Sequence, residues 1–152
     1  MTQRVDLATM MDRLAIDELV TNYAVAVDDA DWSAYRSLFT RDGRADYRSS
    51  GGIEGPAAEV ADWMAETMRI FPVRQHLIVN RRLSIQDLGG YPGDRAEVRA
   101  DYVNPMRLES GDDFVSGGRY SFGALRTEAG WRLGSVVIQE KWRRGSGSLS
   151  DG

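Results

Sequence analysis

The sequence predicts an α+β fold, a cone-shaped α+β barrel in which N-terminal helices pack in a curved antiparallel sheet with an internal pocket. Apolar residues recur at helical spacing up to Pro72, and beyond it the period changes from 3.6 to 2 and stays there. Helices followed by consecutive hairpins are the α+β pattern, and only the helices can cover the apolar face of this sheet. A long, twisted and bulged sheet folded over helices forms a cone with a cavity at its open end.

The composition indicates one domain, residues 1–144, followed by a flexible tail, residues 145–152. The chain has 152 residues, 42% of them hydrophobic, and its net charge is −4 with dispersed basic residues. These values argue against nucleic acid and anionic membranes as partners. No apolar run approaches the roughly 18 residues of a membrane span. The N-terminus, expected to be frayed over residues 1–6, lacks a signal-sequence pattern, so we expect a cytoplasmic protein.

The residue types and motifs that the sequence lacks exclude several kinds of chemistry. There is no cysteine, which excludes disulfides, zinc–thiolate sites and thiol nucleophiles. The single histidine argues against a transition-metal site, since such sites usually recruit several nitrogen or sulfur ligands. No P-loop, GxGxxG or GxSxG motif is present, which leaves nucleotide binding and serine hydrolysis unsupported. We expect neither a metal nor a cofactor.

Three helices are expected before Pro72. The first spans residues 7–29, with Thr9 and Asp12 as a candidate capping pair or, alternatively, a start one turn earlier. Asp31 is typical of the N-cap of a short second helix, and Gly55-Pro56 opens the third with proline at the first helical position. The apolar sides of the second and third helices comprise Trp32, Tyr35, Leu38, Phe39, Ala57, Val60, Ala61, Met64 and Met68, bordered by Trp63. Between these two helices the sequence predicts a turn at 40–43, a short strand at 44–48 and a flexible loop at 49–52.

Four strands joined by hairpin turns are expected after Pro72, at residues 73–87, 95–109, 113–127 and 130–143. Their turns are rich in glycine, aspartate and serine. Gly117-Gly118 interrupts the third of these strands and indicates a bulge or bend. The even residues from Ala96 to Leu108 form one apolar face, as do Phe114, Tyr120, Phe122 and Ala124 in the next strand.

His76, the only histidine, is the residue whose ordinary pKa already suits acid–base chemistry near neutral pH. A carboxylate beside it would fix its tautomer and stabilise its cation, and Asp28 near the end of the first helix is the candidate. Tyr23 lies on the apolar side of the same helix, where core packing also explains it. Tyr23 and Asp28 project about 140° apart on an ideal helix. Both reach one cavity only if the helix bends near Asp28 or the cavity wraps around its end.

Residues 7–143 resemble the SnoaL-like branch of the nuclear transport factor 2 superfamily. The resemblance is carried by the helix 16–28, Asp31-Trp32, Gly55-Pro56, the strand segment 74–80 and Gly130-Trp131-Arg132-Leu133. Scytalone dehydratase, bile acid 7α-dehydratase and hexachlorocyclohexane dehydrochlorinase in this superfamily pair a helix-end aspartate with a strand histidine.

The resemblance implies that His76, Asp28 and Tyr23 are catalytic. It also suggests a hydrophobic pocket, and a homotrimer with a dimer as the second choice. Scytalone dehydratase uses two histidines and only one exists here, so a further polar group would have to come from Asp101, Asn104, Arg126 or Lys141. Asn80 is expected either to line the cavity or to pair with backbone at a bulge, and the aromatic residues and methionines of the pocket are also what any core would use. The residues expected to bind substrate are Tyr47, Trp63, Met64, Met68, Asn80, Tyr102, Asn104, Tyr120 and Phe122.

Three functions fit this sequence. The first is a cofactor-independent dehydratase that acts on a hydrophobic, cyclic hydroxy-carbonyl compound of polyketide, steroid or aromatic type. The second is an isomerase or polyketide cyclase that uses the same base and pocket. The third is a binding module in which His76 and Asp28 are a buried polar pair, because this superfold also hosts proteins that only bind.

Overall fold

The computed structural model describes residues 6–86 and 89–145. The expected fraying of the first residues and the expected flexible tail fall largely on residues 1–5 and 146–152, which lie outside the described residues. The elements, in chain order, are α1 (Leu7–Asp28), α2 (Trp32–Ser37), β1 (Phe39–Asp46), the 3-10 helix η1 (Arg48–Ser50), β2 (Glu54–Pro56), α3 (Ala57–Thr67), the 3-10 helix η2 (Met68–Ile70), β3 (Val73–Arg74), β4 (Leu77–Gln86), β5 (Arg95–Arg107), β6 (Asp113–Thr127) and β7 (Gly130–Arg144).

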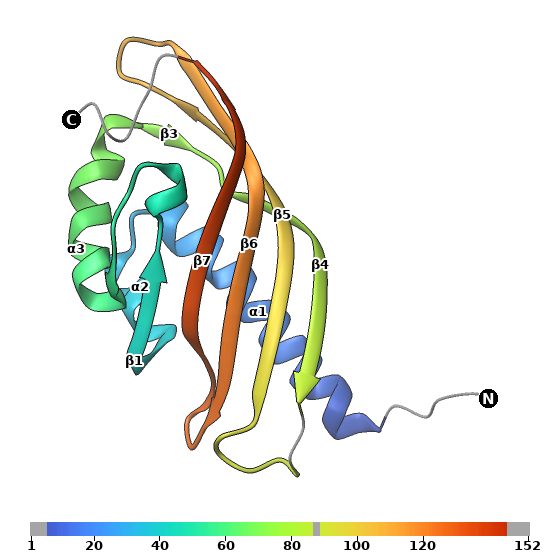
Figure 1. The fold of residues 1–152 in the computed structure, drawn as a ribbon. Coiled ribbons are helices and arrows are strands. Elements are labelled where there is room, and N and C mark those ends of the chain that lie inside the picture. Colours follow the sequence, from blue (N-terminus) through green and yellow to red (C-terminus); the bar gives the residue numbers. More distant parts are fainter. Residues whose placement is uncertain (1–5, 87–88, 146–152) are drawn as a thin grey trace.

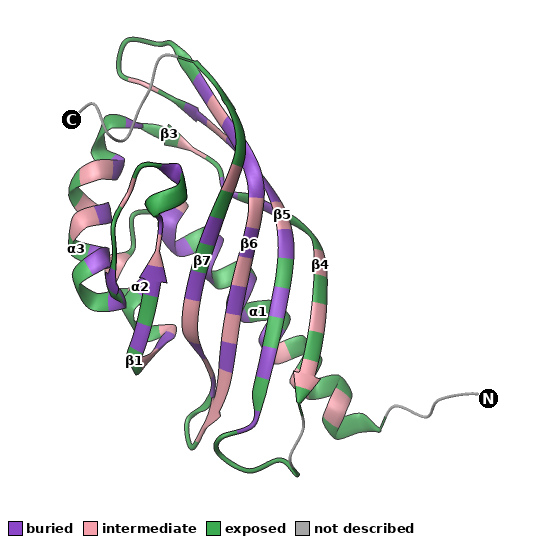
Figure 2. Cartoon of the chain, viewed as in Figure 1, coloured by how far each residue is buried: buried purple, intermediate pink, exposed green. Residues whose placement is uncertain are grey.

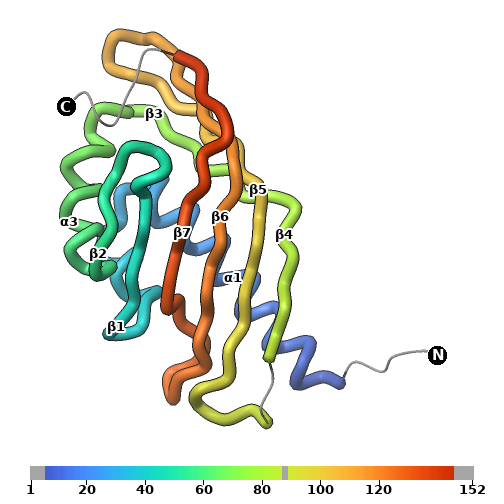
Figure 3. Tube along the Cα trace, viewed as in Figure 1, coloured from blue at the N-terminus to red at the C-terminus, as the bar shows by residue number. Residues whose placement is uncertain are grey.

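The described strands form one curled sheet that stays open, and the helices pack on its concave side (Figure 1). The strand order is β2-β1-β7-β6-β5-β3, and β4 also pairs with β5. Helix α1 runs diagonally across β4 to β7, while α3 stands beside β1 (Figures 1 and 3). This confirms the predicted α+β cone. Among the described helices, none combines the length and the apolar character that crossing a membrane requires.

The period of 2 in the strands matches the observed burial. Along β5 buried and exposed residues alternate, with Val98, Ala100 and Tyr102 inside (Figure 2). Tyr120 and Phe122 of β6 face the same core, and Tyr23 packs edge-on against both rings. Helix α1 and the inner face of the sheet therefore share one aromatic core.

The ends of the first two helices follow local rules. Helix α1 is capped by Asp6, whose Oδ1 accepts from the backbone N–H of Thr9 at 2.8 Å. The expected Thr9–Asp12 capping pair is wrong, because Asp12 instead binds Arg126 across the fold. Asp31 caps α2 as predicted, by accepting from the N–H of Ala34 at 3.0 Å.

The region between α2 and α3 differs from the prediction. The turn expected at 40–43 lies inside β1, which begins at Phe39 because it pairs in parallel with β7 around a bulge before Arg44. Strand β1 ends at Asp46, so the predicted strand 44–48 is too long at its end. The short strand β2 was not predicted, and it pairs with β1. Pro56 lies at the N-cap of α3 and closes β2, one position before the expected site.

The expected strand 73–87 is broken at residues 75 and 76. Val73–Arg74 pairs with the end of β5, and pairing resumes at Leu77. The break frees the backbone N–H of His76 from the sheet, and this N–H donates to Asp28 instead. The bulge expected at Gly117-Gly118 is confirmed, since the register between β6 and β7 shifts at that step.

An ion cluster holds the N-terminal half of α1 to the far end of the sheet. The Arg126 guanidinium binds both carboxylate oxygens of Asp12 at 3.0 and 2.7 Å, and Asp94 at 3.0 Å. It lies 4.6 Å from the centre of the Trp131 ring, whose N–H donates to Asp12. Asp94 is only 1% exposed. Arg126 is therefore a structural residue here, distant from His76 in the cone.

Candidate active site

The candidate site is a pocket formed by α1, α3, the C-terminal halves of β5 and β7 and the N-terminal half of β6. It lies at the opposite end of the sheet from the ion cluster of Arg126. Its cavity volume is about 40 Å³, and its empty space is about 470 Å³ when the open solvent at its mouth is counted. Its walls are mainly aromatic rings and methionines, and its polar side chains come from α1, η1, β5, β6 and β7 and from the segment between β3 and β4. The lining residues are Tyr23, Tyr47, Ser50, Trp63, Met64, Met68, His76, Asn104, Met106, Phe114, Ser116, Tyr120, Ile138, Glu140 and Arg143.

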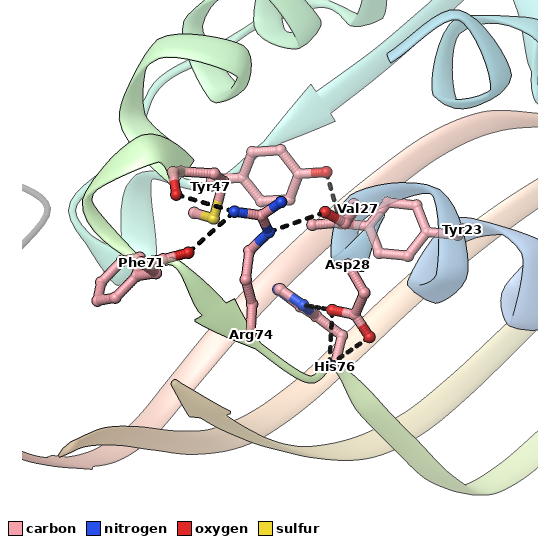
Figure 4. A network of polar contacts seen from close by, with 8 residues as sticks. Tyr23, Val27, Asp28, Tyr47, Phe71, Arg74 and His76 are labelled. Carbon is pink, nitrogen blue, oxygen red and sulfur yellow. Dashed lines mark hydrogen bonds and ion pairs between the residues drawn. The ribbon is translucent and has the colours of Figure 1, made fainter. Parts of the chain in front are cut away.

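Asp28 and His76, 48 residues apart in the sequence, lie in direct contact (Figure 4). The Nδ1 atom of His76 lies 2.6 Å from Asp28 Oδ1. The backbone N–H of His76 also donates to both oxygens of Asp28, at 2.9 and 3.0 Å. One carboxylate therefore holds both the ring and the main chain of His76.

This contact selects the tautomer of the histidine. An ionised carboxylate only accepts hydrogen bonds, so Nδ1 must carry the proton. In the neutral ring Nε2 then keeps its lone pair and can accept a proton. His76 lines the pocket, and its side chain is only 5% exposed.

Arg74 fixes the position of Asp28. Its guanidinium donates to the carbonyl of Val27 at 3.2 Å, and to the carbonyls of Met68 and Phe71 at 3.2 and 2.9 Å (Figure 4). Val27 belongs to the last turn of α1, where carbonyls lack helical partners. A cation at this end is also favoured by the helix dipole. Arg74 thus ties the end of α1, and with it Asp28, to the segment that leads into His76.

The structure resolves the angular conflict between Tyr23 and Asp28. Tyr23 lines the pocket, whereas Asp28 is not among the lining residues and lies behind His76. The two side chains do not need to reach one cavity, because Asp28 contacts His76 and it is His76 that lines the pocket. A bend in the helix is unnecessary.

Three buried tyrosines join their hydroxyl groups beside the pocket. The Tyr47 hydroxyl lies 2.6 Å from that of Tyr23 and 2.8 Å from that of Tyr35. We call Tyr35, Tyr47 and Tyr23 the tyrosine triad. Burial, followed by the neighbouring tyrosines, raises the pKa of Tyr23 well above its ordinary value near 10. Tyr23 therefore stays protonated and remains a hydrogen-bond donor at any working pH.

Asn104 presents an unpaired acceptor to the pocket. The residue is 3% exposed, and its Oδ1 is buried with no hydrogen-bond partner within the described chain. A hydrogen bond from Asn104 lowers the pKa of Tyr120, although burial dominates and raises that pKa to about 12. The amide nitrogen therefore faces Tyr120, which leaves Oδ1 available to a ligand. A buried acceptor without a partner is costly, so it indicates a polar group that a ligand supplies.

Most of the expected substrate-binding residues lie at the pocket, and three lie elsewhere. Tyr102 and Phe122 are buried in the aromatic core, outside the lining. Asn80 is exposed and its Nδ2 donates to Asp101 at 3.2 Å. Its φ of 50° and the register shift between Val79 and Arg82 break the strand alternation, which explains why it does not share the face of His76. Those at the pocket are Tyr47, Trp63, Met64, Met68, Asn104 and Tyr120.

Among the four candidates for an additional polar group, Asn104 alone lines the pocket. Asp101 pairs with Arg119 on the outer face of the sheet, Arg126 belongs to the ion cluster, and Lys141 is exposed. Asn104 does not titrate, so it can orient a ligand but cannot act as a second acid or base.

Arg143 and Glu140 line the pocket although the sequence did not single them out. Their side chains form a two-pronged ion pair, and Arg143 also donates to the carbonyl of Ser50 at 3.0 Å. Regular alternation would place residues 140 and 143 on opposite faces. The bulge opposite Gly117-Gly118 skips Lys141 and turns Arg143 inward. The paired glycines were the only sequence signal for this change.

Comparison with known proteins identifies the class. The chain belongs to the SnoaL-like domain family, whose model matches residues 8–137, within the nuclear transport factor 2-like superfamily. An uncharacterized Mycobacterium bovis protein, Mb2934c, is 32% identical over 130 residues, which are 84% of each chain.

Two solved structures show the same fold. One, from Novosphingobium aromaticivorans and provisionally described as an aromatic ring hydroxylase, has a TM-score of 0.77 and 28% identity, and the match covers 90% of this chain and 94% of that one. A hexachlorocyclohexane dehydrochlorinase from Novosphingobium barchaimii has a TM-score of 0.80 and 16% identity over 93% and 94% of the two chains. Family and fold together support an enzyme or ligand-binding function of the superfamily.

Proposed function

We propose that the protein is a cofactor-independent dehydratase that removes water from a hydrophobic, cyclic β-hydroxy ketone. The observation that carries this proposal is the 2.6 Å contact between Asp28 and His76 Nδ1, which leaves Nε2 as a base for an aromatic-walled pocket. The acceptor Asn104 and the donor Tyr23 line the same pocket. A base, a donor and an acceptor around an apolar cavity match a substrate with one carbonyl and one hydroxyl group.

The elimination begins when Nε2 of His76 removes the proton next to the carbonyl. The electron pair of the broken C–H bond moves into the carbonyl, whose oxygen becomes an enolate that Tyr23 stabilises by donating a hydrogen bond. Asp28 stabilises the imidazolium and keeps it oriented. The enolate then reforms the carbonyl, a C=C bond forms, and the C–O bond to the hydroxyl breaks. The departing oxygen takes the proton back from His76 and leaves as water, so the enzyme is regenerated.

Asn104 orients the substrate in this reaction. Its Oδ1 would accept the hydrogen bond of the substrate hydroxyl and so place the leaving group relative to His76. Sites built to bond a hydroxyl discriminate strongly against analogues that lack it, because the buried partner is then left unpaired. We expect Asn104→Leu, which has similar size but no acceptor, to abolish the preference for hydroxylated ligands over their deoxy analogues. Binding of matched ligand pairs by calorimetry checks this.

The proposal is tested by incubating the protein with a panel of one- to three-ring β-hydroxy ketones and analysing the products by mass spectrometry. A product lighter by one water supports the dehydratase. General acid–base catalysis contributes about 10²–10⁴-fold per group, so His76→Gln should lower the rate by at least this much. Tyr23→Phe should cost less, since the base remains. Arg99→Gln, on the outer face of β5, is the control. A product of unchanged mass would instead identify an isomerase or cyclase, and binding without turnover a binding module.

A further inference from the structure

A row of polar side chains crosses the apolar pocket from strand to strand. In the register of the sheet, Asn104 of β5 lies opposite Ser116 of β6, and Ser116 lies opposite Arg143 of β7. His76 lies on the other side of Asn104, since its neighbours in the chain contact residues 103 and 105 of β5. All four residues line the pocket. The row therefore runs from the base His76 at one end to the cation Arg143 at the other.

The protein itself uses only part of the Arg143 guanidinium. Its Nε and Nη2 atoms donate to the carboxylate of Glu140, and Nη2 also donates to the carbonyl of Ser50 at 3.0 Å. A guanidinium has five N–H donors, so the two on Nη1 are left over. Neither Nη1 nor the hydroxyl of Ser116 has a hydrogen-bond partner among the described residues. This end of the row therefore offers donors to a ligand.

Arg143 lies where the pocket opens to solvent. Its side chain is 31% exposed, and its guanidinium lies 5.5 Å from the centre of the Phe114 ring, which also lines the pocket. Because the cavity volume is only about 40 Å³, a ligand of two rings must extend into this mouth. A charged ligand group at the mouth keeps part of its hydration, whereas the same group among the inner aromatic rings would be costly. Glu140 fixes the guanidinium in place before a ligand arrives, which lowers the entropic cost of binding.

We propose that Arg143 binds a carboxylate of the substrate at the end of the pocket remote from His76. Hydrogen bonds between a guanidinium and a carboxylate are charge-assisted and about twice as strong as neutral ones. Asn104 and Arg143 are two strand spacings apart, about 10 Å between their backbones. A frame of two rings bridges such a span, with its hydroxyl at Asn104 and its carboxylate at Nη1 of Arg143. The substrate class is therefore a cyclic hydroxy ketone that also carries a carboxylic acid.

This inference rests on the proposed function for the identity of the reacting groups, but its test measures binding alone. The probes are a hydroxynaphthoate, with its two groups at opposite ends of the rings, and the corresponding carboxamide. The two have nearly the same shape and differ in charge. Calorimetry at about 0.15 M salt, where distant charges are screened, gives the ratio of acid affinity to amide affinity. For the wild-type protein we expect the acid to bind about tenfold more tightly than the amide.

Two variants should change this ratio in opposite directions. Arg143→Gln should weaken binding of the acid about tenfold and bring the ratio close to one, because the cation is lost. Glu140→Gln should strengthen binding of the acid about two- to fivefold, because it removes the carboxylate that competes for the same cation. The glutamine oxygen can still accept a hydrogen bond from Arg143. If Arg143→Gln loosens the segment around Ser50, both ligands weaken alike and the ratio is unaffected by that loosening.

Arg144→Gln is the matched control. Arg144 is exposed and follows Arg143 in β7, so it lies on the opposite face of the sheet. This variant loses the same charge one position away, so an effect of net charge would appear in it and a direct contact would not. The ratio should therefore stay at the wild-type value.

Several results would overturn the inference. They are equal affinities of the wild-type protein for acid and amide, no binding of either probe at millimolar concentration, or an equal fall of the ratio in Arg144→Gln and Arg143→Gln. If Arg143→Gln does not fold, Glu140→Gln decides, and a ratio that does not rise refutes the inference. An acid preference that depends on Arg143, without dehydration of any hydroxy ketone, would refute the proposed function alone. Dehydration of neutral substrates without an acid preference would refute this inference alone.

Discussion

Replacing Asp28 with asparagine tests how one carboxylate serves two donors of the same residue. Asp28 accepts from the ring nitrogen of His76 and from its backbone N–H. Asparagine offers a single acceptor oxygen, and its NH₂ group only donates. The asparagine oxygen can still meet both donors, as Asp28 Oδ1 does, but both bonds lose their charge, and the NH₂ group in place of Oδ2 faces the backbone N–H of His76. Hydrogen bonds to charged groups contribute about 1.5–3 kcal/mol each, so Asp28→Asn should keep the fold but lower the free energy of unfolding by about this amount.

Urea unfolding followed by tryptophan fluorescence measures this change. In a His76→Ala background the ring donor is gone, and the asparagine oxygen can still accept from the backbone N–H. Asp28→Asn should then destabilise much less, and the double-mutant cycle should show a coupling energy above about 1 kcal/mol. Activity should fall by orders of magnitude in each single variant, with losses that are far from additive.

NMR gives an independent readout, because the chain has one histidine and ¹⁵N-histidine labelling reports on His76 alone. In the wild-type protein at a pH where the ring is neutral, the proton should reside on Nδ1. In Asp28→Asn the population of this tautomer should change. The reasoning is refuted if Asp28→Asn has wild-type stability together with a wild-type tautomer.

Three further predictions concern the ion cluster and the assembly. Arg126→Met should lower the free energy of unfolding by about 3–5 kcal/mol, because it removes the cation that pairs with the buried or partly buried carboxylates of Asp12 and Asp94. Thermal unfolding measures this change, and a loss below about 1 kcal/mol would contradict the prediction. The hydrogen bond from Arg126 holds the pKa of Asp12 below its usual value, so the stabilisation that this ion pair provides is present above about pH 4 and is lost as the pH falls further. Asp12→Asn should therefore make the free energy of unfolding depend less on pH in this range, and an unchanged pH profile would contradict this prediction. We expect a homotrimer, as the family resemblance implies, and light scattering should give about three times 16.9 kDa. If exposed Val103 and Val137 lie in the contact, Val137→Glu should dissociate the assembly, and a wild-type mass near one chain would rule the homotrimer out.

The sequence by itself determined the parts of the fold that depend on local periodicity. The helical spacing from residue 7 to residue 28 and the alternation along β5 and β6 each report which face of one element is apolar. The change of period after Pro72 was enough for the α+β class, and Gly117-Gly118 was enough for a bulge. The pairing of Asp28 with His76 came from residue chemistry and resemblance, and the structure brings these residues into contact.

Tertiary structure alone decided the features that depend on which distant segments meet. Strand β1 starts early because it pairs with β7, about 90 residues away in the chain, and no local pattern encodes that pairing. The break before Leu77 leaves the N–H of His76 to Asp28, a residue 48 positions earlier in the chain. The bulges in β4 and β7 place the side chains of Asn80 and Arg143 on the face of the sheet opposite to the one that regular alternation predicts, because one extra residue exchanges the two faces of a strand.

The tyrosine triad shows the same limit. The sequence analysis predicted Tyr35 as a core residue, Tyr23 as catalytic and Tyr47 as substrate-binding, but it indicated nothing about their contact. Their hydroxyls meet only because α1, α2 and Tyr47, the residue that follows β1, pack around one point inside the sheet. A hydrogen bond between side chains depends on positions in space to within a fraction of an ångström. Periodicity predicts which face is buried, and only the assembled fold sets which buried polar groups touch.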